Sequence, residues 1–121
     1  TTKMYYHRGN KDTTDVATTL TTGTWFHLIA INDGTNIKLY KDNSLFASGL
    51  SGGTEVMTLT AFNIGREYNG STHLPNAIID EVGVWDKVLS AQEMTDLYNG
   101  GNGQTMIDTK GVFILMQLAA Q

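Results

Sequence analysis

The sequence has no cysteine, a single proline and no long apolar run. Without cysteine the chain can form neither disulfide bonds nor thiolate metal sites, and small secreted eukaryotic domains usually depend on disulfides. We therefore expect a bacterial source, or a virus assembled in a reducing cytoplasm. No apolar stretch approaches the roughly 20 residues that span a bilayer, so membrane insertion is not expected. The chain begins at Thr1 without an initiator methionine or signal peptide, and we expect it to be a piece of a longer protein.

Positive charge is also scarce. The chain contains eight Lys and Arg residues and twelve Asp and Glu residues, which gives a net charge of -4 and a pI near 5.1. The basic residues do not cluster, so the sequence lacks the positive patch that binds nucleic acid or anionic lipid. We expect neither a nucleic-acid partner nor a membrane surface.

The composition favours strands and tight turns. Thirteen glycines and many threonines accompany short apolar stretches, a pattern typical of β-sheet proteins. At 121 residues the chain is long enough for one core and too short for two. We expect a single all-β domain over residues 1–121. The expected strands are residues 3–8, 25–31, 37–41, 45–47, 57–59, 62–66, 77–85 and 111–118.

Turn residues separate several of these strands. Residues 9–15 (GNKDTTD) are polar and predict a loop. Asn32, Asp33 and Gly34 predict a hairpin between the strands on either side. Alternation along the strands predicts which side chains form the core. The expected core residues are Trp25, Ile29, Leu39, Ile64, Val82 and Val84.

One helix is predicted at residues 91–99. Ser90 is its expected N-cap, and Glu93 three residues later completes a capping box. Leu89 and Met94 are spaced to pack against each other as a hydrophobic staple. Gly100 is placed to end the helix in a left-handed conformation.

Several motifs together resemble one known family. They are GTWFHL at 23–28, IKLYKD at 37–42, NIGR at 63–66, IDEVGVW at 79–85, VLSAQE at 88–93 and LYNGG at 97–101. In this order they resemble the laminin-G-like domains of the concanavalin-A-like lectin/glucanase superfamily, which occur in phage structural proteins and bacterial surface proteins. The resemblance covers roughly residues 23–103 and implies an antiparallel β-sandwich of the jelly-roll type.

The sequence departs from the family pattern at two places. The family usually has more strands before the tryptophan strand than 24 residues can supply, so we expect the first strands of the jelly roll to be missing. The family's Asp-Gly hairpin is replaced by Asp42 and Asn43.

The superfamily includes glucanases, whose retaining mechanism needs two carboxylates about 5 Å apart. Asp80 and Glu81 are adjacent, and adjacent strand residues point to opposite faces. We therefore expect no catalysis. On an extended strand Asp80 would share the apolar face of Ile78 and Val82, where a buried carboxylate needs a partner. Backbone N–H groups or Arg66 could supply it, and a ligand-facing Asp80 is the alternative.

The two tryptophans also have two interpretations. Trp25 and Trp85 could stack on sugar rings, but in strands of this pattern they are more often core residues. We assign both a structural role, together with Arg66, Asp80, Ser90 and Glu93.

Metal sites find little support in the sequence. The three histidines, His7, His27 and His73, are not spaced as zinc ligands. Calcium is left open as an alternative, because many laminin-G-like domains bind it through loop carboxylates. No other cofactor is expected. The candidate calcium ligands are Asp12, Asp15, Asp33 and Asp42.

Two functions compete. The first is a non-catalytic recognition or adhesion module that binds a glycan or another host-surface ligand, displayed on a virion appendage, a capsid or a bacterial surface. Its candidate ligand-binding residues are Asp33, Asn43, Tyr68, Asn69 and His73. The second is a purely structural decoration or fibre-anchoring module that packs against other virion or surface-protein chains as an oligomer. The almost continuously apolar residues 112–118 and the missing front strands favour this second function. A glycoside hydrolase is a remote third.

Overall fold

The computed structural model describes the backbone of residues 3–8, 11–17, 20–51, 64, 77–103 and 117–120, and the side chains of residues 20–49, 64 and 77–103. The elements, in chain order, are β1 (Lys3–Arg8), β2 (Lys11–Ala17), β3 (Trp25–Asn32), β4 (Asn36–Lys41), β5 (Ser44–Ser51), β6 (Ala77–Asp80), α1 (Ala91–Tyr98), the 3-10 helix η1 (Asn99–Gly101) and β7 (Gln117–Ala120). The strands expected at 57–59 and 62–66, apart from Ile64, and most of 111–118 lie outside the described residues.

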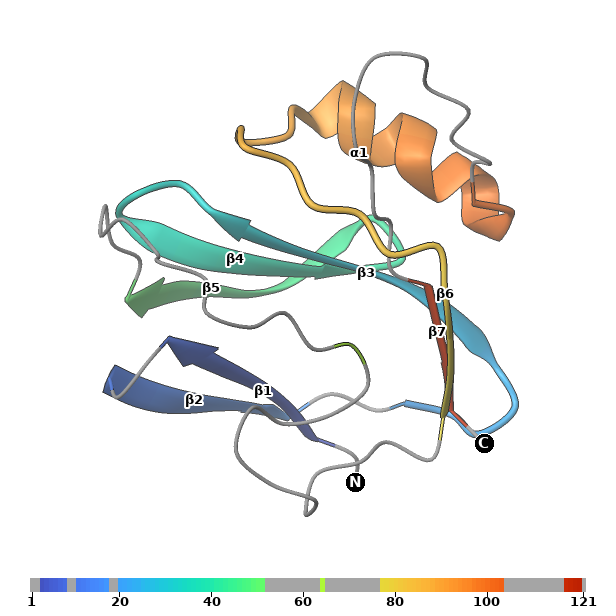
Figure 1. Cartoon of the computed structure of the whole chain (residues 1–121), viewed down its shortest axis with the longest axis horizontal. Helices are drawn as coiled ribbons and strands as arrows, with labels where there is room; N and C mark the ends of the chain where they lie inside the picture. The colour runs from blue at the N-terminus through green and yellow to red at the C-terminus, as the bar shows by residue number, and fades with distance from the viewer. Residues whose placement is uncertain are drawn as a thin grey trace.

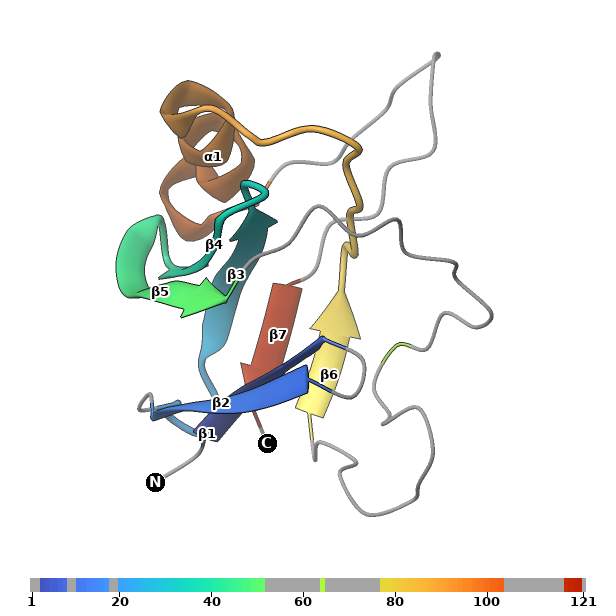
Figure 2. The same cartoon turned by 90° about the vertical axis from the view of Figure 1, so that its left-hand side faces the viewer.

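The strands form two antiparallel sheets. Five strands pair in the order β5-β4-β3-β7-β6, and β1 pairs with β2. Figure 1 shows α1 over one face of the five-stranded sheet and the β1–β2 hairpin on the other side. Seen from the side in Figure 2, the hairpin crosses in front of β6 and β7. The described part is thus mostly antiparallel strand with one short α-helix, which is consistent with the expected β-sandwich.

The β3–β4 hairpin carries apolar side chains on both faces of the sheet. Ile29 and Ile31 alternate along β3 and point to the same face, which α1 covers. Leu39 lies opposite Ala30 in the register and therefore points to the other face, as does Ile37 two residues before it. Ile37 is fully buried. The central strands can therefore bury apolar surface against a layer on each side.

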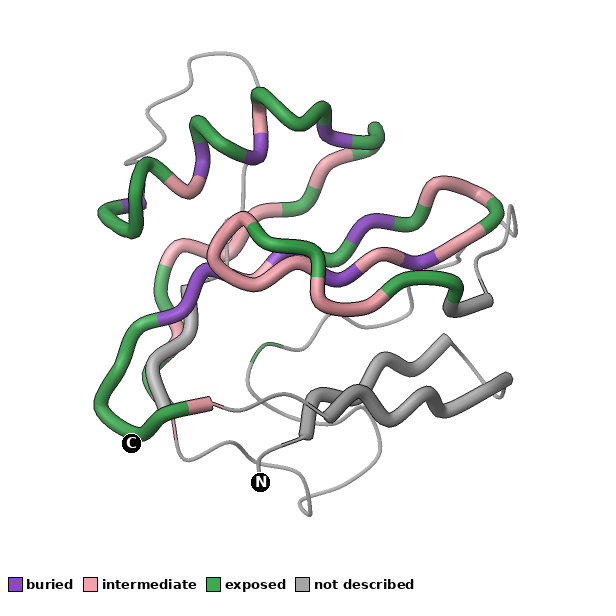
Figure 3. The backbone as a smooth tube through the Cα atoms, turned by 180° about the vertical axis from the view of Figure 1, so that it is seen from behind, coloured by how far each residue is buried: buried purple, intermediate pink, exposed green. Residues whose placement is uncertain are grey.

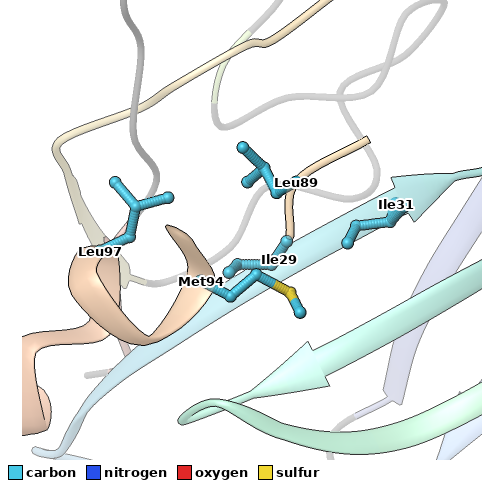
Figure 4. Packing of buried hydrophobic residues seen from close by; sticks show 5 residues of the cluster. All are labelled: Ile29, Ile31, Leu89, Met94 and Leu97. Atoms are coloured by element: carbon cyan, nitrogen blue, oxygen red, sulfur yellow. The ribbon is translucent and has the colours of Figure 1, made fainter. Parts of the chain in front are cut away.

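The helix begins where the sequence predicts. The Ser90 hydroxyl accepts the Glu93 backbone N–H at 3.2 Å, and the Glu93 carboxylate accepts the Ser90 N–H at 2.9 Å, so the capping box is confirmed. Leu89 and Met94 are both buried in one cluster, as the staple predicts (Figure 4). Gly100 is left-handed as expected, but Asn99 is left-handed as well and ends the helix one residue earlier.

Two predicted boundaries are wrong. Residues 11–15, expected in a loop, begin β2, and Asp15 pairs with Tyr5. The threonines and Val16 of this segment suit a strand, and pairing with β1 outweighs its polarity. The strand expected at 77–85 ends at Asp80, because Glu81 has a φ of 48° and leaves the extended conformation.

The core prediction is confirmed for Ile29 and Leu39 and wrong at three other positions. Val84 is 53% exposed, because the chain after Glu81 no longer alternates as a strand. Trp25 is 45% exposed, because it is the first residue of β3 and follows an exposed loop (Figure 3). Ile64 is 46% exposed.

The sixth expected core residue falls between these outcomes. Val82 is half-buried. Trp85, which the sequence assigned a structural role, is partly buried and packs against the cluster below α1.

Candidate functional site

The β3–β4 turn is built around Asp33. Its carboxylate accepts the backbone N–H of Asn36 at 2.7 Å and of Thr35 at 3.0 Å, and it pairs with the Lys38 ammonium at 3.0 Å. The hydrogen bond from Asn36, followed by the one from Lys38, lowers the pKa of Asp33 to about 2. The carboxylate expected to bind a ligand therefore already holds the turn together.

The β4–β5 turn has a type I′ backbone. Asp42 and Asn43 have φ values of 50° and 61°, the left-handed pair that this hairpin requires. Asp42 donates its N–H to the His27 carbonyl at 2.9 Å, and its carboxylate accepts the His27 N–H at 3.0 Å. The Asn43 amide donates to the Thr95 hydroxyl at 3.0 Å. The turn is thereby fixed to β3 on one side and to α1 on the other.

Asp33 and Asn43 do not come together. They lie at opposite ends of β4, whose six residues span about 20 Å at the usual strand rise. The same separation applies to Asp33 and Asp42 as calcium ligands. The structure therefore does not join these described candidates into one site.

The other candidates fall in parts that the structure does not describe. Tyr68, Asn69, His73 and Arg66 lie outside the described residues. Two calcium candidates, Asp12 and Asp15, lie in β2, and their side chains are not described.

His27 is the buried polar residue between the turn and α1. It is 3% exposed, and its ring centroid lies 5.8 Å from that of Tyr98. Neither ring nitrogen has a hydrogen-bond partner among the described residues. Burial lowers the pKa of His27, and the nearby charge of Asp42 opposes the shift. The ring is therefore held in its neutral form around neutral pH.

Asp80 is exposed rather than buried. Its carboxylate accepts the Glu81 backbone N–H at 2.9 Å, so one backbone donor does satisfy it. Asp80 shares its face of β6 with the exposed Ile78, and the expected apolar neighbour Val82 lies beyond the end of the strand. The expectation of a buried carboxylate at this position is wrong.

The sheet register adds a surface that the sequence did not single out. Trp25 lies opposite Ala119 of β7, which lies opposite Ile78 of β6. Directly opposite residues point to the same face of a sheet, so the exposed side chains of Trp25 and Ile78 lie on one face. The sequence signal was the position of Trp25 at the start of its strand, but the neighbouring strands follow only from the fold.

No group of three His, Asp or Glu residues within the described ranges is placed to hold a metal ion. In the same part of the chain, no helix is long and apolar enough to cross a membrane.

The chain was compared with known proteins. Residues 1–95 match a laminin-G-type family model described as the concanavalin A-like lectin/glucanases superfamily. The comparisons with curated proteins and with solved structures gave no match. The family model spans more than half of the 121 residues and includes the β3–β4 hairpin, the β4–β5 turn and the start of α1. The chain therefore belongs to the laminin-G-like family of the concanavalin A-like lectin/glucanase superfamily.

Proposed function

We propose that this chain is a non-catalytic recognition domain that binds a glycan on a cell or host surface. The observation that carries the proposal is the match of residues 1–95 to a superfamily described by its lectins and glucanases. The antiparallel sheet braced by α1 supplies the kind of rigid frame on which binding surfaces are usually built.

The placement of Asp80 and Glu81 supports binding over hydrolysis. A retaining glucanase needs two carboxylates about 5 Å apart across the scissile bond. Asp80 is the last residue of β6, while Glu81 has already turned away with a left-handed backbone and donates its own N–H to Asp80. This adjacent pair is poorly suited to flank a sugar from both sides.

The proposed location is a virion surface or the outside of a bacterial cell. The absence of cysteine and the resemblance to phage and bacterial surface modules support it. Calcium binding by the candidate carboxylates is an additional part of the proposal, and the proposal of glycan binding does not depend on it.

An array of immobilised oligosaccharides tests the proposal directly. We expect saturable binding of a limited set of glycans, measured in calcium and again in a chelator to reveal any dependence on the metal. The same measurement on the Tyr68→Ala variant tests whether residues 66–73 contribute to glycan binding. An array without specific binding would contradict the proposal.

A hydrolysis assay on β-glucans accompanies the array. We expect no turnover by the wild-type chain and therefore no change in Glu81→Gln. Hydrolysis that disappears in Glu81→Gln would contradict the non-catalytic part of the proposal.

A structural module is the second candidate. Several large apolar side chains are exposed on the described surface, and such side chains can mark contacts with other chains. They are Trp25, Leu45, Ile64, Ile78, Val84 and Val88. Oligomers in sedimentation together with an empty glycan array would favour this second function.

A further inference from the structure

The side of the sheet that carries α1 is only partly covered. Trp25, His27 and Ile29 alternate along β3 and therefore share this face. Ile29 is buried below α1 and His27 lies against Tyr98 at the end of that helix, whereas Trp25 is 45% exposed. Helix α1 thus covers this face of β3 as far as His27 but does not cover Trp25.

Exposed side chains on the same face are also found in the described part of β6. The register places Trp25, Ala119 and Ile78 in one row, and His27, Gln117 and Asp80 in the parallel row two residues along each strand. Trp25 and His27 share one face of β3, and Ile78 and Asp80 lie on the same face in β6, because strand residues two apart share a face. Ile78 is 48% exposed and Asp80 is exposed.

We propose that Trp25, Ile78 and Asp80 form a binding platform for neutral pyranosides. This inference rests on the proposed glycan-binding function and assigns it a different surface from the turns at Asp33 and Asn43. Trp25 provides an exposed indole on which the C–H face of a sugar ring can stack. Asp80 provides a carboxylate that accepts hydrogen bonds from sugar hydroxyls.

The spacing suits an oligosaccharide. Trp25 and Ile78 are separated by two strand intervals, or about 10 Å at the usual spacing between neighbouring strands. This distance is comparable to the length of a disaccharide. One ring can therefore lie on Trp25 while the next reaches Ile78 and Asp80.

The carboxylate of Asp80 also disfavours the binding of an apolar protein surface to this platform. A protein surface that buried Trp25 and Ile78 would remove water from the neighbouring carboxylate without necessarily pairing it, which is costly. A sugar can stack its C–H face on the indole while its hydroxyls donate hydrogen bonds to the carboxylate. The Glu81 N–H holds one carboxylate oxygen at 2.9 Å, so the group is already oriented before a ligand binds.

Charge narrows the ligand class further. The chain has a net charge of -4, and the platform itself contains the carboxylate of Asp80. An acidic sugar would be repelled by both. The inferred ligands are neutral pyranosides whose ring has an unbroken C–H face, such as β-glucosides and β-galactosides.

Tryptophan fluorescence can test this surface, because the chain has two tryptophans. Trp85→Phe leaves Trp25 as the sole tryptophan and keeps an aromatic ring against the helix cluster. We expect cellotetraose, laminaritetraose or β-1,4-galactotetraose to change the intensity and blue-shift the emission of Trp25 in a saturable way. Trp25→Phe, which retains only Trp85, should show no such blue shift with the same sugars.

Affinities of single variants give a second readout by calorimetry with the sugar that binds. Trp25→Ala should weaken binding by about tenfold, as the loss of an aromatic stacking contact predicts. Asp80→Asn should weaken it by a few-fold, because an amide is a poorer acceptor than a carboxylate. Leu45→Ala and Val88→Ala remove exposed apolar side chains elsewhere and should leave the affinity unchanged.

The outcomes separate this inference from the proposed function. Glycan binding that persists unchanged in Trp25→Ala would overturn the platform and leave the glycan-binding function standing. An array that binds no glycan would overturn both. Sialyllactose bound as tightly as the neutral sugars, or equal losses in Leu45→Ala and Trp25→Ala, would also overturn the platform as described. Circular dichroism of each variant confirms that the fold compared is the same.

Discussion

His27 is the residue at which the sheet, the β4–β5 turn and α1 meet. Its backbone exchanges hydrogen bonds with Asp42, while its ring lies against Tyr98, and in the described part of the chain both ring nitrogens lack a hydrogen-bond partner. A buried polar group without a partner costs free energy, and a buried positive charge would cost more. The position therefore tolerates the neutral ring and opposes its protonation.

This environment predicts acid sensitivity near pH 6. The folded pKa of His27 is lowered, so below the ordinary value of 6.5 the unfolded chain takes up a proton that the folded chain does not. The free energy of unfolding should be unaffected by His27 above pH 6.5. It should fall by up to about 1.4 kcal/mol per pH unit as the pH drops below that value.

His27→Phe and His27→Gln test the assignment. Both variants lack an ionisable ring, so urea midpoints measured from pH 5 to 8 should lose this component of the pH dependence. At pH 7 His27→Phe should be neutral or stabilising by about 1 kcal/mol, because an unsatisfied polar group is removed. A wild-type slope retained in both variants between pH 5 and 6.5 would assign the effect to another group. Asp33 and Glu93 do not interfere, because their lowered pKa values near 2 act at more acidic pH.

At the level of the elements, short-range signals predicted the structure well. The capping box of Ser90 and Glu93 and the Asp42–Asn43 turn form through hydrogen bonds and backbone preferences among neighbouring residues. The sequence contains all the partners of such features. That is why these predictions are confirmed without knowledge of the rest of the fold.

Exposure could not be predicted in the same way. Trp25 and Ile29 share a face of β3, but one lies below α1 and the other beyond it. Alternation predicts to which face of the sheet a side chain points, but not whether that face is covered there. The covering element is α1, which lies some 65 residues later in the chain. The end of β6 was missed because a left-handed glutamate at position 81 is uncommon for a residue with a side chain.

The helix cap is testable with one pair of variants. Ser90→Ala leaves a first-turn N–H without its acceptor and should lower the free energy of unfolding by about 1 kcal/mol. Ser90→Thr keeps the hydroxyl and should remain close to the wild type. Urea denaturation at pH 7 measures both. An unchanged midpoint in Ser90→Ala would mean that the cap contributes nothing in solution.

The β4–β5 turn offers a second pair at Asn43. Asn43→Gly and Asn43→Ala both lose the hydrogen bond to Thr95, but glycine accepts the φ of 61° without strain. Asn43→Ala should therefore be less stable than Asn43→Gly by about 1 kcal/mol. Thr95→Ala loses the same hydrogen bond without touching the turn and serves as the control. Equal stability of the two Asn43 variants would contradict the left-handed backbone at this position.

On the scale of the whole molecule, one sheet supports two layers. Ile29 and Ile31 pack below Leu89, Met94 and Leu97 on the helix side. The opposite face carries other buried residues and is turned toward the β1–β2 hairpin (Figure 1). The sequence predicted an antiparallel β-sandwich, but it placed the described ligand candidates, Asp33 and Asn43, in the turns. The register that aligns Trp25 with Ile78 depends on strand order, and strand order is a property of the complete fold.

If the two layers fold as one unit, a substitution that destabilises one face of the sheet must also lower the stability of the layer on the other face. Ile37 is fully buried on the face away from α1, so Ile37→Ala should lower the free energy of unfolding by about 2–5 kcal/mol. Leu45→Ala, at an exposed position of β5, should change it by less than about 0.5 kcal/mol. Trp85 lies in the helix layer, and its fluorescence in a Trp25→Phe background reports on that layer alone. In this background Ile37→Ala should shift the Trp85 transition and the far-ultraviolet circular dichroism transition to the same lower urea midpoint. A Trp85 midpoint that stays at its original value while the circular dichroism midpoint falls would mean that the two faces of the sheet unfold independently.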